Sequence, residues 1–188
     1  MNNYRKISKI LTSKPTSDGA GVKLNRVFGY YEVPLLDPFL LLDDFGSENP
    51  DDYIAGFPWH PHRGIETVTY MLNGAVEHGD SMDNKGIIKS GDVQWMTAGS
   101  GIIHQEMPER VEGKMRGFQL WLNLPAKHKM MAPRYQEVSS EQIPDFSPAT
   151  GVQVKVICGE MDGIQGPVQE LVVDSEYLDI SLESNAHF

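Results

Sequence analysis

Residues 66–97 read ETVTYMLNGAVEHGDSMDNKGIIKSGDVQWMT, and this stretch decides the fold class. Its apolar residues alternate or form short runs that end at Gly, Asn or Asp, as in strands separated by turns. The runs are rich in β-branched and aromatic residues, and Asn73-Gly74 suits a turn that needs positive φ. A helical period is weak throughout. The stretch therefore predicts a series of short strands.

The same pattern continues beyond this stretch. GFQLWLNL at 117–124 is a further predicted strand. Turn residues recur roughly every 8 to 12 residues, which is typical of an all-β sandwich or barrel. Parallel strands joined by helices would require helical patterns that the chain lacks.

The chain changes character after the first group of strands. Residues 126–148 are rich in Pro, Lys, Ser and Glu and are interpreted as a connector, with a short helical turn at 139–142. Strand-like segments then resume at 152–157, 170–173 and 177–182. We predict an N-terminal domain over 1–135, followed by a linker and the beginning of a second β domain over 136–188.

Composition excludes several classes of protein. The 188 residues carry a net charge of -10, which argues against direct nucleic-acid binding because such binding depends on Lys and Arg. The single cysteine, Cys158, cannot form an internal disulfide and is expected in the core. With no apolar run near the ~18 residues of a membrane span, we expect a cytoplasmic protein without membrane contact.

Two histidine clusters carry the chemistry: FPWHPHRGIE at 57–66 and GSGIIHQEMP at 99–108. In a strand, residues i and i+2 share a face, so His60 and His62 can point into one barrel interior. His104 and Glu106 repeat this spacing on another strand. Three imidazoles and a carboxylate suit Fe(II), Mn, Co, Ni or Cu(II), and no cysteine pair offers a structural zinc site.

The sequence also predicts positions for the three remaining histidines and for the apolar residues near the clusters. His78, His128 and His187 are expected in loop-like or terminal positions outside the metal site. Four apolar side chains near the clusters are expected either to line a slot for a flat aromatic ring or to belong to the core. These four are Phe57, Trp59, Met96 and Ile103.

The stretch from His60 to Pro108, beginning HPHRGIETVTYMLNG and ending GSGIIHQEMP, resembles the pirin family of the cupin superfamily. The resemblance continues through GFQLWLNLPAKHKMMAPRYQ and is far more specific than a general cupin pattern. It implies two cupin barrels, each a double-stranded β-helix of jelly-roll type. From the resemblance we expect a complete N-terminal barrel and a second barrel that is only begun, since YLDISLESNAHF looks like an early strand of that barrel.

The resemblance also implies a ligand set: one divalent metal, preferably Fe(II), with Ni, Co, Cu, Mn or Zn as alternatives. Its ligands would be His60, His62, His104 and Glu106. The broader cupin pattern would instead nominate Glu66, which by strand alternation has the parity of His60 and His62. Glu66 is then a ligand or orients one, although Glu106 is the preferred ligand.

Two functions follow from the resemblance. The first is quercetin (flavonol) 2,3-dioxygenase activity, with Glu106 or Glu66 as the catalytic base that takes a proton from the flavonol. The alternative is a non-enzymatic, redox-sensing iron protein that acts through protein partners. Unpaired strand edges in a partly built second barrel would also favour homo-oligomers.

Overall fold

The computed structural model describes residues 7–188, and in that part of the chain every regular element is a strand or a single 3-10 turn. The fold class predicted from the sequence is therefore confirmed. The 3-10 turns are η1 (Pro50–Asp52), η2 (Ala126–His128) and η3 (Ser140–Gln142). The predicted helical turn at 139–142 is present as η3. Ser139 and Gln142 form a capping box that stabilises it.

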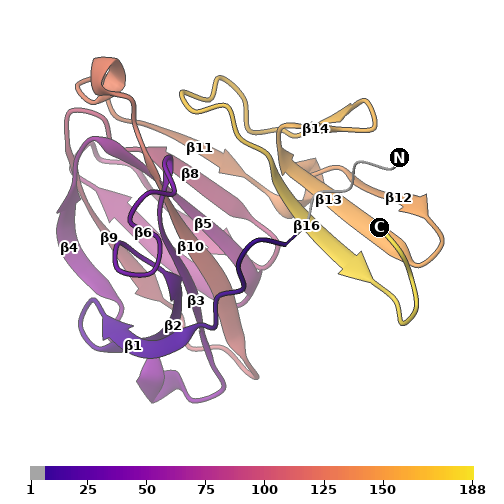
Figure 1. Ribbon diagram of the computed structural model, residues 1–188. Coiled ribbons are helices and arrows are strands. Elements are labelled where there is room, and N and C mark those ends of the chain that lie inside the picture. Colours follow the sequence, from indigo (N-terminus) through magenta and orange to yellow (C-terminus); the bar gives the residue numbers. More distant parts are fainter. Residues whose placement is uncertain (1–6) are drawn as a thin grey trace.

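Two sheets form the larger unit of the molecule (Figure 1). The first has seven strands, in spatial order β1 (Lys14–Asp18), β2 (Val22–Phe28), β3 (Phe39–Ser47), β10 (Met115–Asn123), β5 (Ile65–Asn73), β8 (Val93–Thr97) and β11 (Arg134–Val138). The second has four, in the order β4 (Phe57–His62), β9 (Ile102–Pro108), β6 (Ala75–Asp80) and β7 (Lys85–Lys89). All the pairings between these strands are antiparallel.

The seven-stranded sheet is covered on both faces, and β5 shows this most clearly. Its residues 66–71 are all buried, although alternate side chains point to opposite faces. Thr69 faces the interior between the two sheets, where it contacts Glu106 of β9. Val68 and Tyr70 face the other way, into an apolar cluster that includes Ile157 and Cys158 of the C-terminal unit.

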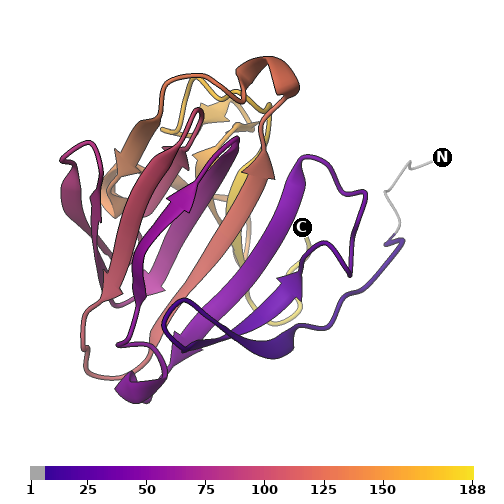
Figure 2. The same cartoon turned by 90° about the vertical axis from the view of Figure 1, so that its left-hand side faces the viewer.

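The C-terminal strands form a smaller unit against this outer face of the seven-stranded sheet (Figure 2). The unit contains a three-stranded sheet in the order β12 (Asp145–Ala149), β13 (Val152–Cys158) and β16 (Tyr177–Leu182), and a small ribbon of β14 (Glu160–Met161) and β15 (Ile164–Gln165). Tyr70 Oη donates to Asp179 Oδ2 across the interface at 2.6 Å. Cys158 is fully buried here, as expected, and burial raises the pKa of its thiol to about 11.

The boundary predicted between residues 135 and 136 falls inside β11, which pairs with β8 of the large sheet. The C-terminal sheet begins only at Asp145. Among residues 7–188, no helix is long and apolar enough to cross a membrane.

Candidate metal centre

The pairing of β4 with β9 brings the two histidine clusters together. His60 lies directly opposite His104 in the antiparallel register, and His62 lies two residues further along the same strand. Alternation then directs all three side chains to the interior face of the four-stranded sheet. The ring centroids of His60 and His104 are 4.4 Å apart, and those of His62 and His104 are 5.0 Å apart.

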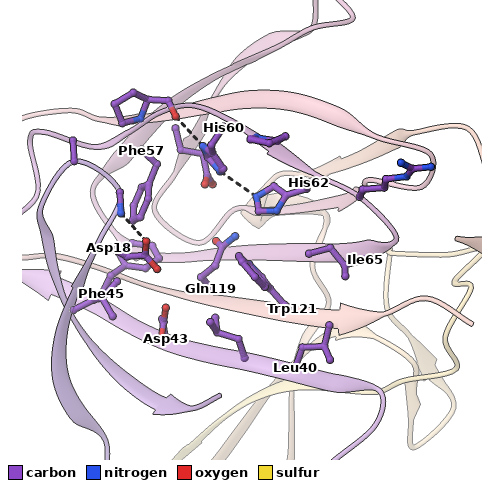
Figure 3. Close-up of a pocket in the computed structure, with 18 residues that line it drawn as sticks. Asp18, Leu40, Asp43, Phe45, Phe57, His60, His62, Ile65, Gln119 and Trp121 are labelled. Atoms are coloured by element: carbon purple, nitrogen blue, oxygen red, sulfur yellow. Dashed lines mark hydrogen bonds between the residues drawn. The ribbon is translucent and has the colours of Figure 1, made fainter. Parts of the chain in front are cut away.

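One nitrogen from each of His60, His62 and His104 lies within 4.8 Å of the other two. The His60 ring is oriented by the backbone, since its Nδ1 lies 2.9 Å from the carbonyl oxygen of Pro58. A carbonyl only accepts, so Nδ1 carries the proton and Nε2 keeps its lone pair. That Nε2 lies 3.0 Å from Nε2 of His62 (Figure 3). The bond from His60 Nδ1 to the Pro58 carbonyl is of the kind that a metal-binding histidine usually donates from its other ring nitrogen.

The other two histidines are buried in the form that binds metals. His104 is 1% exposed, and neither of its ring nitrogens has a hydrogen-bond partner among the described residues. Burial, with the neighbouring imidazoles, lowers the pKa of His62 and of His104 to about 3. Both rings are therefore neutral near pH 7, and one unpartnered ring nitrogen of His104 carries a lone pair that is available to a metal.

Glu106 lies in the same interior but is held by another group. Its Oε1 accepts from Thr69 Oγ1 at 3.0 Å, and burial raises the pKa of its carboxyl. The carboxylate is not one of the three groups whose ligand atoms lie within 4.8 Å of one another. Glu106 nevertheless lines the cavity beside His60 and His62. The structure thus brings Glu106 near the three histidines as a neighbour.

The structure does not bring Glu66 to this group. Its side chain is fully buried on the outer face of the seven-stranded sheet, where Oε1 accepts from Thr97 Oγ1 at 2.7 Å. That is the face of Val68, which packs against the C-terminal unit. The parity argument fails because the chain turns at Gly64, with φ +68°, and passes from one sheet to the other. Alternation counts only within one continuous strand.

The expectation that His78 lies in a loop is wrong. His78 is 5% exposed in β6, and it is the direct partner of Glu106 in the register with β9. Its Nε2 lies 2.7 Å from Glu137 Oε1, but off the direction of the ring N–H, so the contact is one of proximity rather than an aligned hydrogen bond. The alternation of Val76, His78 and Asp80 is the sequence feature that predicts this inward position.

A cavity of about 780 Å³ opens beside His60 and His62. Its walls are mainly apolar, and Phe57 is among the lining residues, as expected. Figure 3 shows Gln119 and Trp121 rising from β10 toward the histidines. The Trp121 ring stands edge-on to His62, with centroids 5.1 Å apart.

The other three apolar residues expected near this slot do not line the cavity. Trp59 and Ile103 are 56% and 48% exposed on the outside of the four-stranded sheet. Both alternate with inward-pointing histidines along their strands, so they point outward. Met96 is fully buried in a cluster with Ala98 and Ile102, and is therefore a core residue.

The family model described as Pirin matches residues 21–122, which include all three histidines and Glu106. The chain belongs to the pirin family. A protein of Pseudomonas aeruginosa named as a candidate quercetin 2,3-dioxygenase is 52% identical over 97% of the chain. A pirin-like protein of Caulobacter vibrioides is 51% identical over 98% of the chain. The chain spans 65% and 67% of the lengths of these two pirins.

Solved structures show the same fold. A crystal structure described as quercetin 2,3-dioxygenase from Acinetobacter baumannii has a TM-score of 0.77 and 37% identity, covering 85% of this chain and 58% of that one. A bacterial pirin from Escherichia coli, solved in complex with nickel(II), has a TM-score of 0.56 and 21% identity. That match covers 90% of this chain and 95% of the nickel-containing pirin.

Proposed function

We propose that this pirin is a metal-dependent dioxygenase that acts on a flavonol such as quercetin. The observation that carries the proposal is the opening of the His60, His62 and His104 cluster onto a cavity of about 780 Å³. This volume lies in the range of about 300–1,000 Å³ that is usual for small-molecule sites. The names of the Pseudomonas and Acinetobacter relatives support the same substrate class.

The donor set favours a first-row transition metal. Neutral imidazoles and a carboxylate suit Fe(II), Ni, Co, Cu or Mn, and three histidines leave coordination positions for other ligands. We propose Fe(II) as the resident ion, and the nickel complex of the Escherichia coli pirin supports a divalent metal in this fold. When bound, such a metal acts as a Lewis acid that lowers the pKa of a coordinated hydroxyl.

The protein side chains would divide the remaining tasks. His60, His62 and His104 would hold the metal, with Glu106 as a fourth ligand or as the base that accepts the proton of the flavonol hydroxyl. The raised pKa of the Glu106 carboxyl suits a base that must take up a proton near neutral pH. Phe57 and Trp121 supply aromatic surface against which a flat ring can pack. Glu66, on the far face of the sheet, has no part in this arrangement.

Oxygen consumption tests the proposal. The purified chain is loaded with iron, nickel, cobalt or copper, metal content is measured by mass spectrometry, and oxygen uptake is followed with quercetin. We expect uptake that disappears in His60→Ala, which loses its metal, and persists in His187→Ala, since His187 is exposed near the C-terminus. Bound metal without uptake would reject the dioxygenase and favour the redox-sensing regulator that acts through protein partners.

A further inference from the structure

Hydrogen bonds link the side chains of Glu106, Thr69 and Gln119 in a row. Thr69 Oγ1 lies 3.0 Å from Glu106 Oε1 and 2.7 Å from the side-chain oxygen of Gln119. Thr69 is 3% exposed, whereas Gln119 is half-buried and lines the cavity. The two residues face each other across the β5–β10 register, on the interior face of the sheet. One threonine hydroxyl therefore stands between the carboxylate and the amide.

The Thr69 hydroxyl can donate only one hydrogen bond, although it lies near two oxygens. A hydroxyl has a single proton and cannot donate to two oxygens at once, and an ionised carboxylate only accepts. The two ends of an amide have the same shape, so turning the Gln119 amide by 180° places Nε2 against Thr69. Gln119 then donates to Thr69 and Thr69 donates to Glu106. In this order each of the two hydrogen bonds has one donor and one acceptor.

The consequence for Glu106 is that only one of its oxygens remains free. Oε1 is occupied by Thr69, and among the described residues no hydrogen bond is made to Oε2. A carboxylate fixed through one oxygen presents the other in a defined direction, and ligating carboxylates in proteins are commonly hydrogen-bonded in this way. Glu106 lines the same cavity as His60 and His62, so its carboxyl group lies beside the three-histidine group.

We propose that Thr69 and Gln119 are positioning residues of the metal centre: Thr69 fixes Glu106 through one oxygen, and Gln119 acts on Glu106 only through Thr69. The proposal rests on the metal site of the proposed function and is independent of the dioxygenase reaction. It adds two polar residues from β5 and β10 to a site that otherwise comes from β4 and β9.

Cobalt(II) binding to the purified chain tests the role of Thr69. Affinity is measured by competition with a chromogenic chelator, and the visible absorption of the bound ion reports its ligand set. We expect Thr69→Val to weaken binding about tenfold or more, as for other losses of such neighbours, and to change the spectrum. Thr69→Ser should restore both. Thr67→Val is the matched control, because Thr67 is equally buried on the same face of β5.

A double-mutant cycle tests the role of Gln119. Gln119→Leu should weaken cobalt binding in the wild-type background and have no further effect in Thr69→Val, because its only route to Glu106 is lost. Equal effects in the two backgrounds would reject this role. Wild-type affinity and spectrum in Thr69→Val, with thermal unfolding showing a folded protein, would overturn the proposal for Thr69.

The outcomes separate this inference from the proposed function. Cobalt binding that depends on His104 but not on Thr69 rejects the inference and leaves the dioxygenase proposal standing. Binding that depends on both residues, without oxygen uptake in the quercetin assay, rejects the dioxygenase and retains the positioning role. If the wild type binds no cobalt, both proposals fail.

Discussion

At the scale of single residues, the candidate metal centre contains buried imidazoles and the carboxyl group of Glu106, whereas the equally buried Glu66 lies outside it. Within residues 7–188, His104 has no polar partner for either ring nitrogen, and leaving its lone pair buried without a partner is costly. Glu106 shares the interior with His104, while Glu66 lies on the other face of the sheet, where Oε1 accepts from Thr97 and Oε2 has no partner among the described residues. Of these two glutamates, Glu106 lines the cavity and Glu66 does not.

The two glutamates give a paired prediction. Glu106→Gln should reduce metal affinity, because an amide is a weaker donor than a carboxylate, whereas Glu66→Gln should leave metal content unchanged. Metal content by mass spectrometry and chelator competition measure both. Loss of metal in Glu66→Gln with retention in Glu106→Gln would restore the general cupin assignment that the geometry here does not support.

The buried histidines predict how stability depends on pH. Their pKa, ordinarily 6.5, is lowered to about 3 in the folded protein, chiefly by burial. The unfolded chain therefore binds more protons between these values. The stability of the metal-free protein is retained above pH 6.5 and falls as the pH drops toward 3. Each histidine contributes about 1.4 kcal/mol per pH unit.

Urea unfolding of metal-free protein at several pH values between 7 and 4 measures this dependence. His104→Gln should show a smaller loss of unfolding free energy over the same pH interval, because one of the two histidines with a lowered pKa is removed. An identical slope in the wild type and the variant would contradict the prediction. The exposed-site variant His187→Ala controls for a general effect of removing a histidine.

At the scale of elements, the site depends on the turn that joins β8 to β9. Gly99 has φ +51°, and a Cβ there would lie 2.2 Å from the carbonyl oxygen of Met131. The carbonyl of Gly99 also accepts from the backbone N–H of Gly64 at 2.8 Å, which ties this turn to the one after His62. The two histidine-bearing strands are therefore aligned by backbone contacts between glycine turns.

Gly99→Ala should thus lower both stability and metal affinity. We expect a loss of at least about 2 kcal/mol of unfolding free energy, because backbone strain is added to a clash with main chain. Gly113→Ala is the control: its φ is +82°, but a Cβ would meet nothing within 4 Å. It should cost about 1 kcal/mol, and denaturant unfolding distinguishes the two. Similar losses in both variants would contradict the steric explanation.

At the scale of the whole molecule, the C-terminal unit buries the outer face of the first barrel. Val68 and Tyr70 contact a cluster that includes Ile157 and Cys158, so the large sheet has no free face there. The three-stranded sheet is less complete. β16 pairs with β13 along one edge, and no described strand pairs with its other edge. Leu182 on β16 is 53% exposed.

We propose that the 188-residue chain associates through this free edge of β16, because unpaired strands with exposed apolar side chains recruit other strands. Sedimentation should show species larger than a monomer, and Leu182→Lys should shift the distribution toward monomer. Glu183→Lys, at an exposed neighbour just beyond the strand, controls for the added charge. A monodisperse wild-type monomer with two-state unfolding would reject association.

The sequence by itself determined the all-β class and the family, but the strand predicted at 170–173 is absent from the structure. It also determined that His60 and His62 share a face, because alternation within one strand fixes the face of each side chain. Only the tertiary structure decided the positions of Glu66 and His78 and the contact of Thr69 with Glu106. Alternation does not carry across the turn at Gly64, where the chain changes sheets. Register between distant strands depends on side-chain packing that spacing along the chain does not record.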